Sequence, residues 1–177
     1  MFLTIYLSVE THRVVMGFLQ NNKKIPMITE NTKAPDFTLP DSEGNKVSLS
    51  AFTGKRVLLV FYPADDSPVC TTQLCSYRDN YTEFSKRGIT ILGISTDSID
   101  SHKQFGEKNS LPFTLLSDHD KRVSESYDAI AFLGISQRAY VLIDEKGIVR
   151  LSFNDFLPLF YQSTRDLLAK IDAMKPE

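Results

Sequence analysis

The segment RVLLVFYPADDSPVC at residues 56–70 decides the fold. It opens with Arg56–Tyr62, a continuous apolar run rich in β-branched and aromatic residues, which is typical of a strand buried on both faces of a sheet. After a polar loop, Cys70–Lys86 contains neither Gly nor Pro and has helical composition, so we predict one helix there. A buried central strand that leads into a helix places Cys70 at the carboxyl edge of a sheet, beside a helix N-terminus.

Strand and helix patterns alternate along the rest of the chain. Upstream, Phe37–Leu39 and Lys46–Leu49 flank a turn and predict a hairpin. Downstream, the patterns predict a strand at Ile89–Ile94, a helix at about Ser98–Lys108, a strand near Phe113–Leu116, a short helix near Lys121–Tyr127, a hairpin of Ala139–Ile143 and Ile148–Phe153, and a C-terminal helix with an apolar stripe of Leu167, Leu168, Ile171 and Met174. This order predicts an α/β fold with a mixed central sheet, in which parallel and antiparallel strands are flanked by helices.

Composition excludes several classes of function. A chain of 177 residues fits one domain of ordinary size. The formal net charge is −2 and no basic run stands out, so the sequence has no electrostatic footprint for nucleic acid or anionic lipid. No apolar stretch approaches the roughly 20 residues that a membrane span needs. The absence of internal repeats and of a Gly-rich phosphate loop argues against two domains and against nucleotide chemistry.

The first 30 residues carry no recognisable chemistry. Phe2–Val9 alternates between apolar and polar positions, and Val14–Leu19 is apolar. Two interpretations stay open: an extra strand or helix packed on the domain, or an upstream start codon with Met27 as the true initiator. Because Met1–Leu19 lacks the basic start and the cleavage site of a secretory signal, we expect a cytoplasmic protein.

Two cysteines, Cys70 and Cys75, are too few for a disulfide framework and suit a reducing compartment, where a cysteine is retained for its reactivity. The three histidines, His12, His102 and His119, form no zinc-binding spacing with them. We therefore expect neither a metal nor another cofactor.

A cysteine at a helix N-terminus is a candidate nucleophile, because free backbone N–H groups and the helix dipole favour the thiolate. Full ionisation of an ordinary thiol gains only about 30-fold at neutral pH, or roughly 2 kcal/mol, so a fast reaction also needs fixed donors around the attacked atom. Ser67 offers a hydroxyl three residues before Cys70, and Arg138 offers a guanidinium from a neighbouring strand. Pro63 provides an apolar wall without a donor.

Each of these residues also has a plainer interpretation. Ser67 alone is explained as a helix cap, and Arg138 as the partner of an acidic neighbour. Cys75 alone is explained by packing inside the helix. We expect Asp65 and Asp66 to be solvated loop charges.

The sequence PADDSPVC at residues 63–70 resembles the P-x-x-x-(T/S)-x-x-C motif of peroxiredoxins. Further family segments recur at the same intervals, so the resemblance extends from about Lys33 to Lys175: they are Ala34–Phe37, Phe61–Pro63, Gly93–Asp97, Pro112–Phe113, and Arg138 followed by Ile143–Asp144. A second cysteine five residues after the first is similar to the bacterioferritin comigratory protein or peroxiredoxin Q subgroup. The resemblance implies a thioredoxin fold of the peroxiredoxin type over residues 31–177, preceded by an N-terminal extension, residues 1–30.

The resemblance also implies roles for the site. Cys70 is the peroxidatic cysteine, Ser67 and Arg138 hold it and the peroxide, Pro63 shields it, and Cys75 resolves the sulfenic acid. Gln73, where many members carry Gln or Glu, is a secondary, structural candidate.

The implied activity is thiol-dependent reduction of hydrogen peroxide and organic hydroperoxides, in antioxidant defence, through a Cys70–Cys75 disulfide. The disulfide is re-reduced by thioredoxin or a glutaredoxin-like dithiol. Members of the subgroup are monomers or dimers, and we expect a monomer or a weak homodimer.

Two cysteines five residues apart on one helix imply motion. Five helical steps separate the two Cα atoms by about 7.5 Å along the axis and about 140° around it. A disulfide needs Cα atoms within about 7 Å and converging Cβ vectors, so closing Cys70 onto Cys75 requires local unwinding.

Two other classes of function remain open. A thioredoxin-like disulfide carrier is disfavoured, because such exchange uses C-x-x-C at a helix start and would leave Ser67 and Arg138 without a purpose. A redox sensor or holdase would share the oxidation chemistry, so only its rate and partner would separate it from an enzyme.

Overall fold

The computed structural model describes residues 28–130, 134, 136–155 and 161–174. The apolar patterns predicted at Phe2–Val9 and Val14–Leu19 lie outside these residues. The described elements are β1 (Thr38–Pro40), β2 (Lys46–Ser48), the 3₁₀ helix η1 (Leu49–Phe52), β3 (Arg56–Phe61), α2 (Pro68–Asp79), α3 (Tyr81–Lys86), β4 (Ile89–Ser95), α4 (Ile99–Lys108), β5 (Thr114–Ser117), α5 (Arg122–Ser126), β6 (Ala139–Ile143), β7 (Val149–Asn154) and α6 (Thr164–Asp172).

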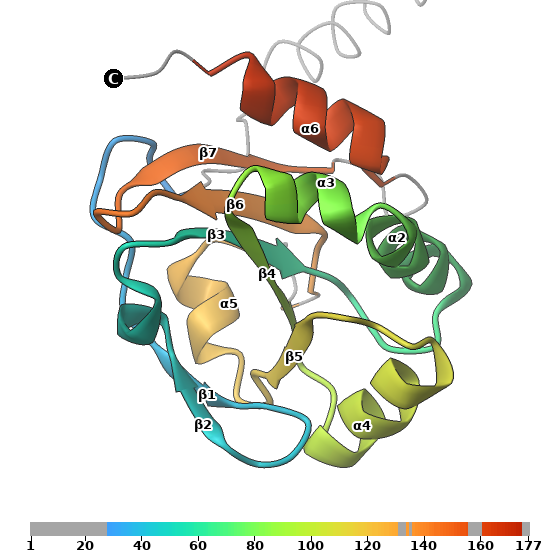
Figure 1. Ribbon diagram of the computed structural model, residues 1–177. Coiled ribbons are helices and arrows are strands. Elements are labelled where there is room, and N and C mark those ends of the chain that lie inside the picture. The colour runs from blue at the N-terminus through green and yellow to red at the C-terminus, as the bar shows by residue number, and fades with distance from the viewer. Residues whose placement is uncertain (1–27, 131–133, 135, 156–160, 175–177) are drawn as a thin grey trace, which may run out of the picture.

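A mixed five-stranded sheet in the order β5-β4-β3-β6-β7 forms the centre of the fold (Figure 1). Strand β3 lies in the middle, parallel to β4 and antiparallel to β6, and five of its six residues are buried. The predicted α/β class and central strand are confirmed. The predicted N-terminal hairpin is also present, as a separate two-stranded antiparallel sheet of β1 and β2.

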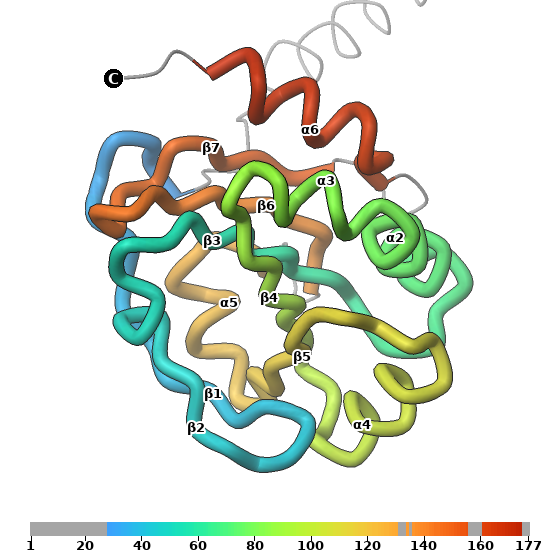
Figure 2. Tube along the Cα trace, in the orientation of Figure 1, coloured from blue at the N-terminus to red at the C-terminus, as the bar shows by residue number. Residues whose placement is uncertain are grey.

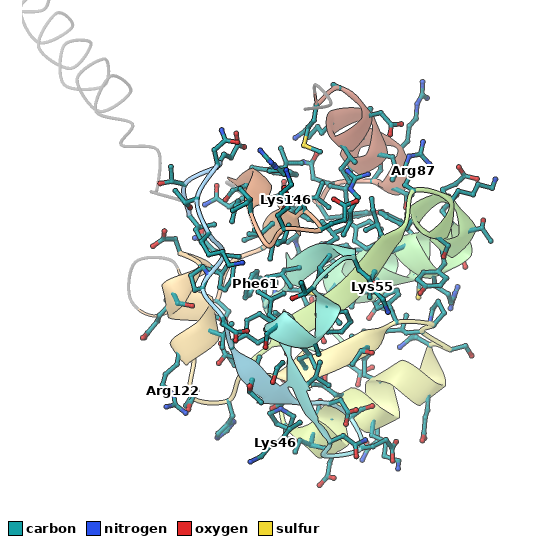
Figure 3. The ribbon with its side chains drawn as sticks, turned by 60° about the vertical axis from the view of Figure 1, so that its left-hand side comes forward. Lys46, Lys55, Phe61, Arg87, Arg122 and Lys146 are labelled. Atoms are coloured by element: carbon teal, nitrogen blue, oxygen red, sulfur yellow. The ribbon has the colours of Figure 1, made fainter. Side chains whose placement is uncertain are left out.

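Side-chain alternation along β3 builds two apolar layers, one on each face of the sheet. Val57, Leu59 and Phe61 join the layer that is covered by η1, α5 and the hairpin. Leu58 and Val60 join the opposite layer, which packs against α2, α3, α4 and α6. Figure 2 shows the path of the chain through the sheet and the helices on its two faces. In the side-chain view, Phe61 lies inside the molecule, whereas Lys46 and Arg122 lie at its periphery (Figure 3).

The predicted helix Cys70–Lys86 is wrong in two respects. It begins earlier, at Pro68, because the missing N–H and fixed φ of proline suit the first helical position. It is also broken, because Asn80 adopts φ −115° and ψ 21° between α2 and α3. The Asn80 side-chain amide donates to the Ser76 carbonyl at 2.9 Å and so caps the end of α2.

The remaining elements lie within a few residues of their predicted positions. Ser98 precedes α4 and accepts a hydrogen bond from the Ser101 N–H at 3.2 Å, as a helix cap does. The predicted apolar stripe of α6 is buried at Leu167, Leu168 and Ile171. In the part of the chain that the structure describes, no helix has the length and apolarity needed to cross a membrane.

Candidate active site

Cys70 is the third residue of α2 and lies on the face of that helix that packs against the sheet. Its side chain is fully buried, and both Cys70 and Cys75 are free thiols. The first N–H groups of a helix have no intrahelical partner, so the start of α2 supplies positive potential near the sulfur.

Arg138 reaches the Cys70 sulfur from the strand next to β3. Ala139, the first residue of β6, pairs with Phe61 at the end of β3, so Arg138 lies at the edge of the sheet from which the loop to α2 departs. Tyr140 belongs to the layer that packs against α2, and strand alternation gives Arg138 the same face. The Arg138 side chain donates from Nη1 to Cys70 Sγ at 3.3 Å, and the residue is only 2% exposed.

Gln73 ties this guanidinium to a buried hydrogen-bond network. Its Oε1 accepts from Arg138 Nη1 at 2.6 Å, and its Nε2 donates to the hydroxyls of Tyr140 at 3.1 Å and Tyr77 at 3.3 Å. The Tyr140 hydroxyl in turn donates to Asp155 Oδ2 at 2.8 Å. Because Gln73 sits one helical turn after Cys70, the network fixes the guanidinium beside the sulfur.

The two tyrosines of this network stay protonated. Burial, reinforced by nearby acidic groups, raises the pKa of Tyr77 and of Tyr140 well above that of an ordinary phenol. Each therefore keeps its proton for a partner, the Gln162 carbonyl for Tyr77 and Asp155 for Tyr140. The sequence interpretation gave Gln73 a structural role and missed Tyr140. Tyr140 lies two residues after Arg138, on the same face of a strand, and this spacing could have indicated that it belongs to the site.

Ser67 is the N-cap residue of α2, but its side chain makes no capping hydrogen bond. Only its backbone is engaged, with its N–H donating to the Asp65 carbonyl at 2.7 Å and its carbonyl accepting from Thr71 at 2.8 Å. Among the residues that the structure describes, the Ser67 hydroxyl has no partner, so it is available to a ligand. Pro63 is half-buried and lies two residues after the end of β3.

Cys75 lies on the same helix as Cys70 and is partly exposed. Its sulfur donates to Asn109 Oδ1 at 3.7 Å, and the carbonyl of Asn109 accepts from Arg78 Nη1 at 2.7 Å. A hydrogen bond from Arg78 to Asp79 raises the pKa of Arg78. The second thiol thus lies beside a cation at the C-terminal end of α4.

The chain matches known proteins over most of its length. The profile of the AhpC/TSA family matches residues 31–152. A chloroplastic peroxiredoxin Q from Sedum lineare is 43% identical over 139 residues, which are 77% of this chain and 75% of that relative. A bcp peroxiredoxin from Coxiella burnetii is 46% identical over 125 residues, which are 66% of this chain and 82% of the relative. The chain belongs to the peroxiredoxin family. It is therefore a thiol-dependent peroxidase.

Solved structures agree with this assignment. Peroxiredoxin Q from Xanthomonas campestris shares 29% identity, aligns with 77% of this chain and 90% of its own, and superposes with a TM-score of 0.69. A reduced 2-Cys peroxiredoxin from Plasmodium vivax shares 31% identity over 81% of this chain and 94% of its own, with a TM-score of 0.74. The predicted thioredoxin fold is confirmed. The bacterioferritin comigratory protein of Xanthomonas campestris, 27% identical, has been studied for alkyl peroxide reduction.

The expectation that Asp65 is solvated is wrong for this peroxiredoxin. The Asp65 side chain is 3% exposed and pairs with His102, whereas Asp66 is 56% exposed and pairs with Lys108. A buried carboxylate needs several donors, and Asp65 finds them on α4, far away in the sequence. No local pattern distinguishes these two neighbouring aspartates.

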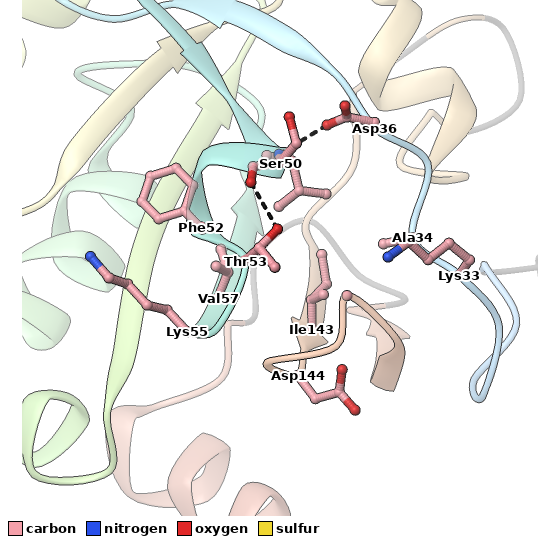
Figure 4. Close-up of a pocket in the computed structure, with 12 residues that line it drawn as sticks. Lys33, Ala34, Asp36, Ser50, Phe52, Thr53, Lys55, Val57, Ile143 and Asp144 are labelled. Carbon is pink, nitrogen blue, oxygen red and sulfur yellow. Dashed lines mark hydrogen bonds between the residues drawn. The ribbon is translucent and has the colours of Figure 1, made fainter.

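A separate cavity of about 130 Å³ lies at the other end of the sheet (Figure 4). Val57 near the start of β3 and Ile143 at the end of β6 lie in its wall, with Lys33 and Asp144 among its charged residues. Cys70 follows the opposite end of β3, so this cavity is not part of the cysteine site. Over the described ranges, His, Cys, Asp and Glu side chains form no cluster of three that would hold a metal ion.

Proposed function

We propose that this peroxiredoxin reduces hydrogen peroxide and organic hydroperoxides with Cys70 as the peroxidatic thiolate and Cys75 as the resolving thiol. The observation that carries the proposal is the contact of 3.3 Å between Arg138 Nη1 and Cys70 Sγ. A fixed cation beside the sulfur stabilises the thiolate and is placed to stabilise the negative charge that develops on the departing oxygen as the O–O bond breaks. The study of alkyl peroxide reduction in the Xanthomonas campestris relative supports the same substrate class.

In the first step, the Cys70 thiolate attacks one oxygen of the peroxide and the O–O bond breaks. The sulfur is oxidised to a sulfenic acid, while the departing oxygen takes up a proton and leaves as water or an alcohol. The uncommitted Ser67 hydroxyl and the Arg138 guanidinium are the proposed donors to the peroxide. Pro63, which has no N–H, is proposed to shield the site from water.

In the second step, the Cys75 sulfur attacks the sulfenic acid, water leaves, and a Cys70–Cys75 disulfide forms. Five helical residues hold the two sulfurs apart on α2, so this step requires the first turns of the helix to unwind. Hydrogen exchange of the oxidised protein should therefore show faster exchange at residues 70–75 than in the reduced protein. An oxidised form that contains the bond and keeps this segment fully helical would refute the step.

A dithiol then reduces the disulfide by thiol–disulfide exchange. We propose thioredoxin or a glutaredoxin-like protein as this reductant, and a cytoplasmic monomer or weak homodimer as the working form. The partial exposure of Cys75 supports access by a partner protein.

The proposal is tested by stopped-flow consumption of hydrogen peroxide, followed by a coupled assay with thioredoxin and its reductase. The wild type should react far faster than an ordinary thiol, and Cys70→Ser should abolish the reaction. A wild-type rate no faster than that of a free thiol would favour the redox-sensor interpretation. Thioredoxin-supported turnover in Cys70→Ser would remove Cys70 from the chemistry.

A further inference from the structure

His102 is a fully buried histidine on α4 that the proposed chemistry does not use. Its Nδ1 lies 2.8 Å from Asp65 Oδ2, and its Nε2 lies 3.1 Å from the carbonyl oxygen of Leu116. Both ring nitrogens therefore face oxygen acceptors at hydrogen-bonding distance.

Two acceptors require two protons on the ring. A backbone carbonyl accepts only, so Nε2 carries a proton for Leu116. A bare Nδ1 would set its lone pair against a carboxylate oxygen, so Nδ1 carries a proton as well, provided that Asp65 is ionised. Burial alone would raise the pKa of Asp65, but hydrogen bonds from His102, Ser101 and Tyr62 outweigh it and lower that pKa. The hydrogen-bond geometry thus has the His102 ring donating from both nitrogens, to a carboxylate and to a backbone carbonyl.

Asp65 anchors the loop that leads to the reactive cysteine. Its side chain also accepts from Ser101 Oγ at 2.7 Å and from the Tyr62 hydroxyl at 2.8 Å. Its backbone N–H donates to Asp97 Oδ2 at 2.9 Å, and its carbonyl accepts from the N–H of Ser67. The loop before α2 is therefore tied to Tyr62 at the end of β3, to α4, and to Asp97 after β4.

We propose that the buried His102–Asp65 ion pair is a positioning device for peroxide reduction, which fixes the loop 63–67 and so holds Ser67 and the start of α2 in the reactive arrangement. His102 acts through Asp65 and touches no substrate. The inference rests on the proposed role of Cys70 and adds a residue that neither the motif nor the histidine spacing indicates.

Two variants and two matched controls test the proposal. Asp65→Asn keeps the shape of the side chain and removes its charge, and His102→Gln removes the imidazolium. Each should slow the first oxidation by hydrogen peroxide about 10- to 100-fold, because small displacements of reacting groups cost about that much. An exposed aspartate and an exposed histidine supply the controls: Asp66→Asn and His119→Gln should stay within about twofold of the wild type.

The double variant separates a shared role from general damage. Since the two side chains form one unit, Asp65→Asn combined with His102→Gln should be no slower than the worse single variant. Rate losses that multiply in the double variant would overturn the proposal, as would unchanged rates in both single variants. If Cys70→Ser still reduced peroxide, the assignment of Cys70 would fail instead.

A spectroscopic measurement on the unaltered protein covers the case in which a variant fails to fold. Nitrogen-15 NMR of the wild type at neutral pH should show protons on both ring nitrogens of His102, and Asp65→Asn should lose one of them. A neutral His102 ring in the wild type would overturn the ion pair and the proposal with it.

Discussion

Arg138 Nη1 lies 3.3 Å from Cys70 Sγ and 2.6 Å from Gln73 Oε1. One nitrogen thus serves the reactive sulfur while a buried amide fixes its position. Replacing Arg138 with methionine keeps much of the apolar stem and removes every donor. We expect the rate constant for peroxide attack to fall by about 10²–10³, as for the loss of one preorganised donor. Stopped-flow peroxide consumption measures it.

Arg138→Lys is the matched control, because it keeps the charge but not the planar fork. It should lie between the wild type and Arg138→Met. A methionine variant that oxidises at the wild-type rate would leave the guanidinium with a packing role only.

Ser67→Ala tests whether the hydroxyl serves the peroxide or the helix. An N-cap side chain that bonds the helix contributes about 1 kcal/mol, but Ser67 makes no such bond. We expect the rate of peroxide attack to fall at least several-fold while the free energy of unfolding changes by less than about 0.5 kcal/mol. Urea denaturation and stopped flow measure the two effects. A stability loss near 1 kcal/mol with an unchanged rate would make Ser67 an ordinary cap.

The central strand was predictable because its signal is local. Strand β3 is buried on both faces. A strand of this kind has an unbroken apolar run in its sequence, as Arg56–Tyr62 does. The break of the following helix at Asn80 was not predictable, because no Gly or Pro marks it. The side-chain bond to Ser76 and the fully buried Phe84 of α3 appear only in the folded chain.

The site divides in the same way. One short segment contains Ser67, Cys70 and Cys75, so their spacing in the sequence was enough to predict that they belong to one site. The contact of Arg138 with the sulfur depends on the register of Ala139 with Phe61, which only the folded sheet supplies. The His102–Asp65 pair joins residues 37 positions apart.

Cys75→Ser tests the resolving step. Without a second thiol on α2, sulfenic acid should accumulate on Cys70 after one equivalent of peroxide, and thioredoxin-supported turnover should stall. The first oxidation should keep its rate, because the Cys75 sulfur contacts Asn109 rather than the Arg138 site. Mass spectrometry with a sulfenic-acid trap detects the intermediate. Turnover at the original rate would remove Cys75 from its role.

Gln73→Leu tests the network behind the guanidinium. The change leaves Arg138 without the acceptor at 2.6 Å and the Tyr140 hydroxyl without the donor at 3.1 Å, both in a buried setting. Losing these buried hydrogen bonds, one of them to a charged group, costs about 1–3 kcal/mol, so we expect that loss in the free energy of unfolding and a slower peroxide attack. Equal stability of the variant and the wild type would show that the network has other means of satisfying these groups.

Asp144, in the turn between β6 and β7, should make stability depend on pH. Burial would raise its pKa, but hydrogen bonds from the backbone of Ile148 and from Arg150 outweigh it, so the pKa lies below the ordinary value of 3.8. A depressed pKa in the folded state contributes stability that is present above the unfolded pKa and is lost as the pH falls through the folded one.

Asp144→Asn should therefore be about 1–3 kcal/mol less stable than the wild type at pH 7, and this difference in stability should close below about pH 4. Urea denaturation at pH 7, 5 and 3 measures it, with the exposed Asp79→Asn as the control, which should cost less than about 1 kcal/mol at pH 7. A gap that is the same at all three pH values would show that the carboxylate charge at residue 144 does not stabilise the turn.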